Sequence, residues 1–222
     1  MGLTKVEVEA AVEIAEGWES YVTVHGIAPK GTMIAIEAGV HCVEHGAGLS
    51  AEVMQKMAEK GIWLCPSVMP LLGLSPEDGK KILDPASFEK FMVVRAQIEE
   101  TMKLAVKHKV KMAYGTDIVA PMQDVLNSDR STIVEFDYLA RFMPNWQALR
   151  MATGNAGELA ALSGPNLRYQ EGGLGQVKEG FYADLLLVDG NPLEDIKLMT
   201  DPKNFKIIMK DGVIYKNTLE QK

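Results

Sequence analysis

The sequence predicts an α/β fold, in which parallel strands alternate with helices and a small β subdomain ends the chain. Three observations predict it. In the first three quarters of the 222 residues, a short apolar run followed by a loop and a helical pattern occurs about four times. These runs are apolar throughout, as expected of parallel strands covered on both faces. In the last quarter, short strand patterns are separated by glycine-containing turns.

The first expected element is a helix over residues 4–16, in which Val6, Ala10 and Ile14 recur at helical spacing and Gly17 ends the helix. Later helices are expected where the same periodicity lies between helix-starting and helix-ending residues. They span residues 32–38, 50–60, 88–108, 131–142 and 146–162. The strands expected between them span residues 21–24, 40–44, 62–65 and 110–114.

Two regions depart from this alternation. Residues 67–85 are rich in proline and glycine and are expected to form a loop, and so long a loop is uncommon unless it has a function. The tail is expected to consist of short strands, because glycines and aspartates separate its apolar runs. These strands span residues 172–177, 183–190, 205–209 and 213–215, the last two forming a hairpin around Lys210-Asp211-Gly212.

Composition excludes several classes of partner. The net charge of −7 argues against a nucleic-acid or anionic-membrane partner, since both need a basic face. No apolar stretch of about 18 residues and no signal-peptide pattern is found in the sequence. Cys42 and Cys65 each lie in an apolar run, which favours reduced core thiols in a cytoplasmic protein over a disulfide scaffold.

Three polar residues occupy equivalent positions on different strands of the predicted fold. His25, His45 and Asp117 each follow a predicted parallel strand directly or in the next turn, and functional side chains of α/β barrels gather at that end. Two imidazoles and a carboxylate suit a divalent metal, zinc above all. The alternative is structural, with each histidine a satisfied polar residue and Asp117 a turn residue. Three such residues at equivalent positions favour a shared metal site.

The other histidines are expected to be structural. His41 begins its strand, at the opposite end from His45. His108 lies in the last turn of a long helix, where an imidazole interacts favourably with the helix C-terminus. Glu44 precedes His45 and is therefore expected to point to the other side of the strand, toward the helices or a loop.

Four residues of the late helices are also given structural roles. Glu135 and Asp137 are expected on a solvated helix face, and Trp146 and Leu149 in the core. None of the four is predicted to take part in the site.

Separated motifs in this order resemble those of the amidohydrolase superfamily, in particular its imidazolonepropionase-like and Xaa-Pro dipeptidase-like (prolidase) branch. The strand motifs are Val22-Thr23-Val24-His25, Val43-Glu44-His45-Gly46 and Tyr114-Gly115-Thr116-Asp117. The supporting motifs are Ala35-Ile36-Glu37-Ala38-Gly39-Val40, Ala152-Thr153-Gly154-Asn155-Ala156 and Gly175-Gln176-Val177-Lys178-Glu179-Gly180.

The resemblance implies the C-terminal half of a (β/α)8 TIM barrel, about four βα units over residues 1–165, followed by part of a small β-sandwich subdomain over residues 166–222. It implies that His25 and His45 bind a divalent metal, most simply zinc, and that Asp117 binds metal and shuttles protons. It also implies hydrolysis of a C–N bond, not an ester, in a small amide, dipeptide or cyclic amide. Residues 67–85 lie where the family often places substrate contacts, with Met69 and Leu71 as a candidate apolar wall.

The family's His-x-His motif and its fourth-strand lysine or glutamate have no counterpart here. A whole barrel needs about 250 residues, and about 165 precede the tail. Half a barrel leaves sheet edges and an apolar face that favour association. Three explanations are open: the chain is truncated, another polypeptide supplies an N-terminal half, or two copies pair to close the barrel. We therefore expect a homo-oligomer or a missing N-terminal half. The alternative function is a catalytically silent half-barrel that acts as an assembly or binding module. A flavodoxin-like sheet is less favoured, because no glycine-rich phosphate loop follows the first strand.

Overall fold

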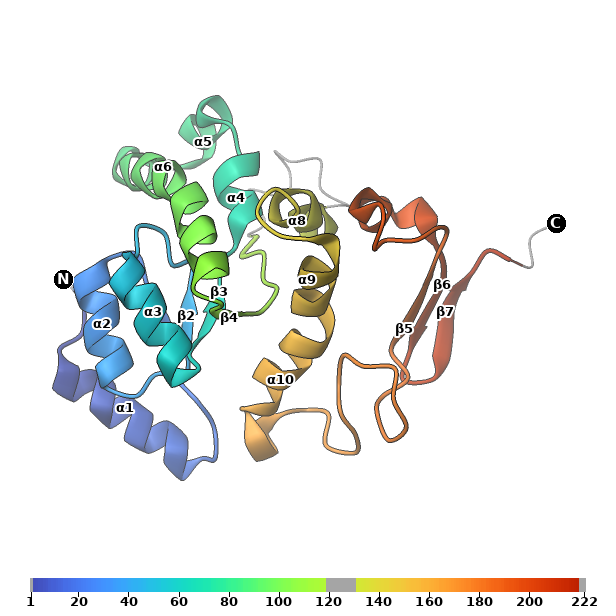
Figure 1. The fold of residues 1–222 in the computed structure, drawn as a ribbon, viewed down its shortest axis with the longest axis horizontal. Helices are drawn as coiled ribbons and strands as arrows, with labels where there is room; N and C mark the ends of the chain where they lie inside the picture. The colour runs from blue at the N-terminus through green and yellow to red at the C-terminus, as the bar shows by residue number, and fades with distance from the viewer. Residues whose placement is uncertain (1, 119–130, 220–222) are drawn as a thin grey trace.

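The computed structural model describes residues 2–118 and 131–219, and its first part is built on a parallel sheet (Figure 1). The strands follow one another in the order β1-β2-β3-β4 and all neighbours are parallel. Their bounds are Thr23–His25 for β1, Cys42–Glu44 for β2, Trp63–Cys65 for β3 and Lys111–Met112 for β4. The predicted strands are therefore present and parallel, although each is shorter than expected.

Alternate residues of this sheet face different surroundings. Val43, Leu64 and Met112 lie in register and are buried in the main core cluster, which also contains Met54 and Ile98 from the covering helices. These helices are α1 (Lys5–Gly17), α2 (Pro29–Glu37), α3 (Ala51–Lys60) and α6 (Pro85–Lys107). The predicted helices are confirmed here, with α2 and α6 each beginning three residues earlier than expected because Pro29 and Pro85 occupy their first turns.

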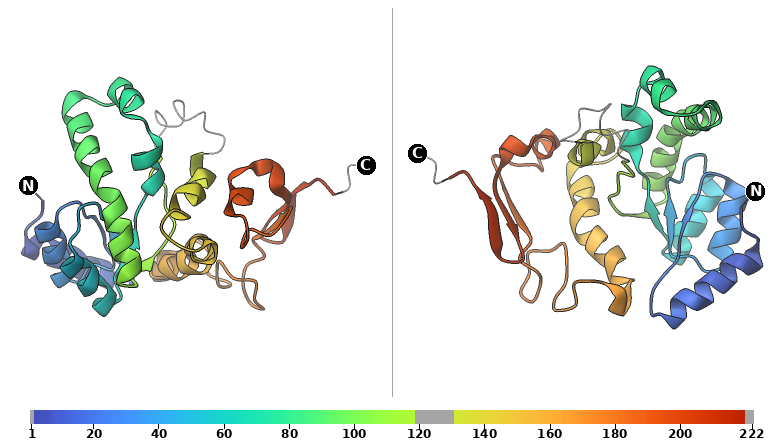
Figure 2. Two further views of the ribbon diagram at one scale, coloured as in Figure 1. Left: turned by 45° about the horizontal axis from the view of Figure 1, so that its top comes forward. Right: turned by 180° about the vertical axis from the view of Figure 1, so that it is seen from behind.

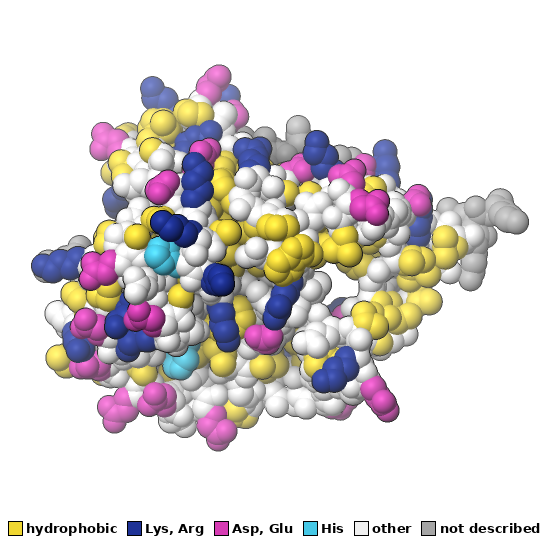
Figure 3. Space-filling view, in the orientation of Figure 1, with side chains coloured by type: hydrophobic (Ala, Val, Ile, Leu, Met, Phe, Trp, Pro, Cys, Tyr) yellow, Lys and Arg dark blue, Asp and Glu magenta, His cyan; other side chains and the backbone are white. Residues whose placement is uncertain are grey.

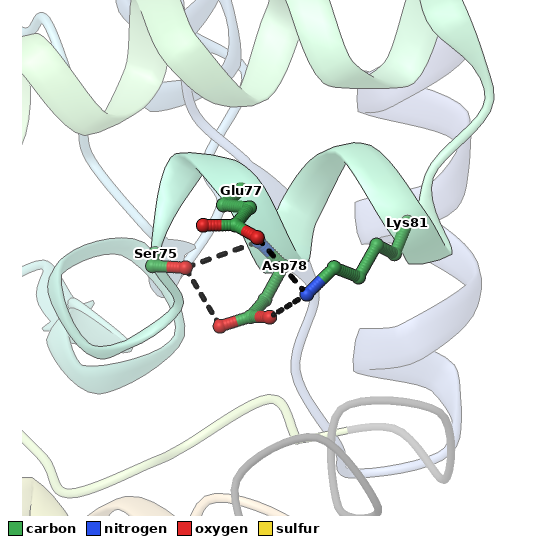
Figure 4. A network of polar contacts seen from close by, with 4 residues as sticks. All are labelled: Ser75, Glu77, Asp78 and Lys81. Carbon is green, nitrogen blue, oxygen red and sulfur yellow. Dashed lines mark hydrogen bonds and ion pairs between the residues drawn. The ribbon is translucent and has the colours of Figure 1, made fainter.

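Residues 67–85 are not the loop that we expected. They form two short helices, α4 (Val68–Gly73) and α5 (Pro76–Ile82). At the start of α5, the Ser75 hydroxyl accepts a hydrogen bond from the Asp78 backbone N–H, and Lys81 pairs with Asp78 at 2.9 Å (Figure 4). Ser75 and Pro76 are thus an N-cap and a first helical residue, the roles these residue types favour.

Three consecutive helical elements follow α8 (Ser131–Leu139): α9 (Asn145–Arg150), the π-helix η1 (Met151–Asn155) and α10 (Ala156–Ala161). At η1 the helix contacts the outer edge of β4. The Met151 carbonyl accepts a hydrogen bond from the Tyr114 backbone N–H, and the Asn155 side-chain amide donates a hydrogen bond to the Met112 carbonyl. Leu149 packs partly buried against the core, but Trp146 is 55% exposed, so the expectation of a core Trp146 is wrong.

The tail forms a separate three-stranded antiparallel sheet in the order β5-β6-β7 (Figures 1 and 2). The strands are β5 (Leu185–Val188), β6 (Phe205–Lys210) and β7 (Val213–Asn217), which confirms the predicted hairpin. The strand expected at 172–177 is wrong, because only an isolated bridge between Gly173 and Phe181 is formed there. Short 3-10 turns complete the tail: η2 (Gly164–Asn166), η3 (Ile196–Thr200) and η4 (Pro202–Asn204).

The tail sheet is joined to the rest of the molecule through η3 and β6. Ile196, Met199 and Phe205 belong to the same buried cluster as Phe136 and Leu139 of α8. On the face seen in Figure 3, acidic and basic side chains are interspersed rather than separated into patches of one charge. Among the described residues, no helix is long and apolar enough to cross a membrane.

Candidate functional site

The three residues predicted to form a site line one pocket at the carboxyl ends of the parallel strands. His25, His45 and Asp117 share a cavity of about 370 Å³ with apolar side chains from the α4–α6 region. A larger hollow of about 450 Å³ lies between the α9–α10 helices and the tail and contains no histidine. The smaller cavity is therefore the better candidate for chemistry.

Three of the strand ends that form this pocket pass through a left-handed backbone conformation. His45 after β2, Ser67 after β3 and Asp117 after β4 have φ angles of 66°, 49° and 49°. Non-glycine residues adopt this conformation at a cost of roughly 1–3 kcal/mol, and they cluster at functional sites. Beside them, a side chain at Gly26 would overlap Val43, and one at Gly115 would overlap the Cys65 sulfur. The chain therefore packs tightly where it turns into the pocket.

The two histidine rings lie against each other. Nδ1 of His25 is 2.7 Å from Nε2 of His45, and the rings are stacked with their planes 12° apart. Two nitrogen ligands of one tetrahedral zinc ion lie roughly 3.3 Å apart, given zinc–nitrogen bonds of about 2.0–2.1 Å. At 2.7 Å the pair is about 0.6 Å closer than two ligands of one ion, and one ring can donate a hydrogen bond to the other at this distance.

Asp117 approaches the pair from a different side. Its carboxylate lies 4.0 Å from Nδ1 of His45, the ring nitrogen that does not face His25. The three donors therefore do not converge on one point. In the parts of the chain that the structure describes, no three His, Cys, Asp or Glu side chains are close enough together to hold a metal ion. The described residues fit two ligands of a metal centre, with a carboxylate beside one of them.

Burial of the His45 ring lowers its pKa, while the nearby Asp117 carboxylate acts in the opposite direction. The net lowering favours the neutral imidazole. Only a neutral imidazole nitrogen binds a metal ion, so this shift supports a ligand role for His45.

Glu44 lies on the same face of the sheet as His25, not on the helix-covered face that we expected. It is paired in register with His25 and accepts a hydrogen bond of 2.6 Å from the Thr23 hydroxyl. The Cys42 sulfur lies 3.8 Å from the same carboxylate oxygen, and burial raises the Cys42 pKa to about 12. Cys42 is therefore a buried, protonated thiol, in keeping with a packing role.

Glu135 is the polar residue of this region whose position the sequence did not reveal. It was expected on a solvated helix face, yet it is 1% exposed. Its two carboxylate oxygens accept hydrogen bonds from the backbone N–H groups of Val68, at 2.8 Å, and Met69, at 2.6 Å. Burial raises its pKa to about 7, although both hydrogen bonds act in the opposite direction. The missed signal is that Glu135 lies four residues before the buried Leu139 and therefore on the same face of the helix, whereas Asp137 does not.

Parallel strands whose carboxyl ends carry a histidine pair and a carboxylate define an α/β protein of the barrel type, with its site at the face where such barrels place it. Residues 1–215 match the Amidohydrolase family, and the chain belongs to this family. The resemblance stated from the sequence motifs is confirmed.

Known proteins that resemble the chain are about twice its length. Ochratoxinase from Aspergillus niger is 30% identical over 216 residues, which are 95% of this chain and 41% of that protein. A crystal structure of an amidohydrolase has a TM-score of 0.87 and 28% identity, covering 99% of this chain and 50% of the other. A Xaa-Pro dipeptidase with bound methionine has a TM-score of 0.79 and 31% identity, covering 97% and 49%.

A third solved structure is a prolidase complexed with N-methylphosphonate-L-proline, with a TM-score of 0.84, 28% identity and coverage of 97% of this chain and 50% of that one. The chain therefore spans about half the length of these relatives. The predicted fold class is confirmed: four parallel strands match half of a barrel protein, and a small antiparallel sheet follows.

Proposed function

We propose that the chain carries part of the active site of a metal-dependent hydrolase that cleaves amide or peptide C–N bonds in small molecules, not esters. The observation that carries the proposal is the convergence of His25 Nδ1 and His45 Nε2 to 2.7 Å, inside a pocket at the carboxyl ends of parallel strands. Relatives named as prolidase, Xaa-Pro dipeptidase and ochratoxinase support a dipeptide or other small amide as the substrate.

The pocket residues divide the work of this reaction. His25 and His45 would hold the metal ion, most simply zinc, whose chemistry is to polarise a carbonyl and lower the pKa of water toward about 7. Asp117 would accept the proton of the attacking water and return it to the leaving nitrogen. Pro70, Leu71 and Phe91 would bind the apolar part of the substrate and exclude water.

A metal centre needs more ligands than the two converging histidines that the described residues supply. The proposal therefore includes further ligands from outside these residues. We propose that a second set of barrel strands, from another copy of the chain or from a separate half, completes the centre.

Free Cys42 and Cys65 favour a cytoplasmic location. The 166–222 region is proposed to be the chain's part of a composite β-sandwich domain.

The second candidate function is a catalytically silent half-barrel that serves as an assembly or binding module. The observation that favours it is that, within residues 2–118 and 131–219, no three ligand-type side chains converge. The two candidates differ in metal content and in turnover.

The deciding experiment measures bound metal by mass spectrometry and hydrolysis of Xaa-Pro dipeptides and N-acyl amino acids. His25→Ala and His45→Ala are expected to lose the metal, and activity should fall at least about 100-fold, since even outer partners of a ligand contribute 10–100-fold. Asp117→Asn is expected to lower turnover while keeping metal.

His108→Ala, at the end of α6 and outside the pocket, is the matched control. A wild-type chain that has no metal or turnover, either alone or combined with a separate N-terminal half, would establish the silent module instead.

A further inference from the structure

The helix α4 forms part of the pocket wall but is too short to hold its own position. It has six residues, and Pro70 and Leu71 line the same cavity as His25 and His45. A helix of this length is not stable by itself in water, so its position must come from contacts with the rest of the molecule. Its two ends show where those contacts are.

The first end is held by α8. Ser67 turns the chain out of β3 with φ of 49°, which aims the N–H groups of Val68 and Met69 at the buried carboxylate of Glu135. The Glu135 side chain thus accepts hydrogen bonds from two backbone N–H groups in the first turn of α4. These groups have no carbonyl partner within the helix. Residue 135 is 66 and 67 positions away from them in sequence, so this is a tertiary contact and not a local cap.

The second end is held by α6. The Arg95 guanidinium donates hydrogen bonds to the carbonyl oxygens of Leu71 and Leu74, the latter at 2.9 Å. These are carbonyls at the end of α4, where intrahelical donors run out. Arg95 directly follows Val94 on α6, and Val94 lines the pocket.

The charges at the two ends suit the helix. An acid accepts at the N-terminal end of α4 and a guanidinium donates at its C-terminal end, so both interact favourably with the helix dipole. The two side chains come from different helices, α6 and α8, both of which follow α4 in sequence. Because neither Glu135 nor Arg95 lines the cavity, their effect on it must pass through α4.

We propose that Glu135 and Arg95 are positioning residues that clamp α4 at both ends and thereby fix the apolar wall of the pocket. Through that wall they determine which apolar group of the substrate the pocket accepts. The clamp is a property of the fold, and only its consequence for substrate choice rests on the proposed hydrolase function.

The clamp is tested by hydrogen–deuterium exchange followed by mass spectrometry on the full chain at pD 8, where the Glu135 carboxylate is ionised. Glu135→Gln keeps the size of the side chain but replaces one acceptor by a donor. Exchange in peptides covering residues 67–75 is expected to accelerate about tenfold or more, the effect of one lost buried hydrogen bond. Peptides covering 23–25 and 42–45 should change less than about twofold.

Arg95→Gln tests the C-terminal end of α4 independently. If Glu135→Gln does not fold, this variant alone decides whether the clamp exists. It should accelerate exchange in the same peptides. The matched controls are Asp137→Asn on α8 and Lys103→Gln on α6. Unchanged exchange in 67–75, a change in only one of two folded variants, or a uniform acceleration over the whole chain would each overturn the clamp.

Substrate choice is tested by kinetics with N-acyl amino acids whose acyl groups increase in size. Glu135→Gln is expected to raise KM for the largest acyl group about tenfold, a loss typical of an apolar contact, with kcat within about threefold of wild type. An equal fall in kcat for all substrates would overturn the role in substrate choice. Absence of hydrolysis by the wild-type chain, both alone and combined with a separate N-terminal half, would instead contradict the proposed function, and the exchange experiment would still decide the clamp.

Discussion

The two sides of the candidate pocket are built in different ways. The polar side consists of His25, the last residue of β1, His45, which directly follows β2, and Asp117, which lies in the segment after β4. The apolar side consists of helical residues such as Leu71 and Phe91, and its α4 part is held by Glu135 and Arg95. The first side is therefore placed by the sheet, and the second by side-chain contacts over long sequence distances.

The residues proposed to carry out the reaction are therefore positioned separately from the residues proposed to determine which substrate fits. The strand ends are held by backbone hydrogen bonds to neighbouring strands, on both sides for β2 and β3. A short helix held by two side chains can be displaced by a single substitution. The predictions below therefore change one side and ask whether the other responds.

The largest effect is expected for Glu135→Ala. It leaves the N–H groups of Val68 and Met69 buried without their acceptor, so the free energy of unfolding should fall by about 3 kcal/mol. Urea denaturation measures the loss, with Asp137→Ala as the control. The NMR signals of His25 and His45 should stay in place, and a shift of those signals would show that the two sides are not independent.

A second effect concerns pH. Burial raises the pKa of Glu135 from 4.5 to about 7, so the folded state holds this proton more tightly than the unfolded state does. The associated stability is fully present below about pH 4.5 and is lost as pH rises through 7, by roughly 3 kcal/mol at most. Tyr114 and Cys65 also interact with Glu135, and because burial raises the pKa of each, both stay neutral in this range.

The comparison that isolates this group is wild type against Glu135→Gln. The difference in free energy of unfolding between the two should change over pH 4.5–7.5, with wild type losing stability relative to the variant as pH rises. Parallel stability curves would contradict the assignment.

A smaller effect is expected for Leu71→Ala, which shortens the apolar wall without touching its anchors. The ratio of kcat/KM values for large and small acyl groups should change roughly tenfold, as for a few methylene groups in a partly open pocket. Bound metal should be the same as in wild type. A variant that loses metal would show that the apolar side also supports the histidines.

The smallest effect is expected at the surface of α5. Lys81 pairs with Asp78 at 2.9 Å and with Glu77 at 3.5 Å, but all three side chains are well exposed. Such pairs contribute little in water. Lys81→Ala should leave the urea midpoint and the acyl-group preference unchanged, whereas a measurable change would mean that the pocket wall depends on this surface network as well as on the buried clamp.

The positions of the residues on the polar side could be predicted from the sequence because their signals are local. An apolar, β-branched run followed at once by a histidine, as at Val24 and His25, indicates both the strand and the position of the ligand-type side chain. The parallel order of the strands then brings His25 and His45 together. The missing information was the orientation of each ring, since nothing in the residue order shows that His45 faces His25 with one nitrogen and Asp117 with the other.

The apolar side was predicted only in part, because most of its contacts are distant in sequence: Leu71 lines the pocket as expected, whereas Met69 is buried outside the pocket lining. The prolines and glycines of residues 67–85 suggested a loop, although Ser75-Pro76 is a regular helix start. Glu135 was placed in solvent because its partners lie 66 and 67 residues away. Trp146 was placed in the core, but the first turn of α9 leaves it exposed. For Glu135 and Trp146, a tertiary contact, or its absence, outweighed the local pattern.

The tight packing at Gly26 and Gly115 has a consequence for protein engineering. Any larger residue there would overlap Val43 or the Cys65 sulfur, so random mutagenesis of the strand ends should yield mostly inactive or unfolded variants. Leu71 and Val94 of the helical wall already carry side chains and are only partly buried. A library aimed at new substrates should therefore be confined to α4 and α6, where a change of shape leaves the histidine pair in place.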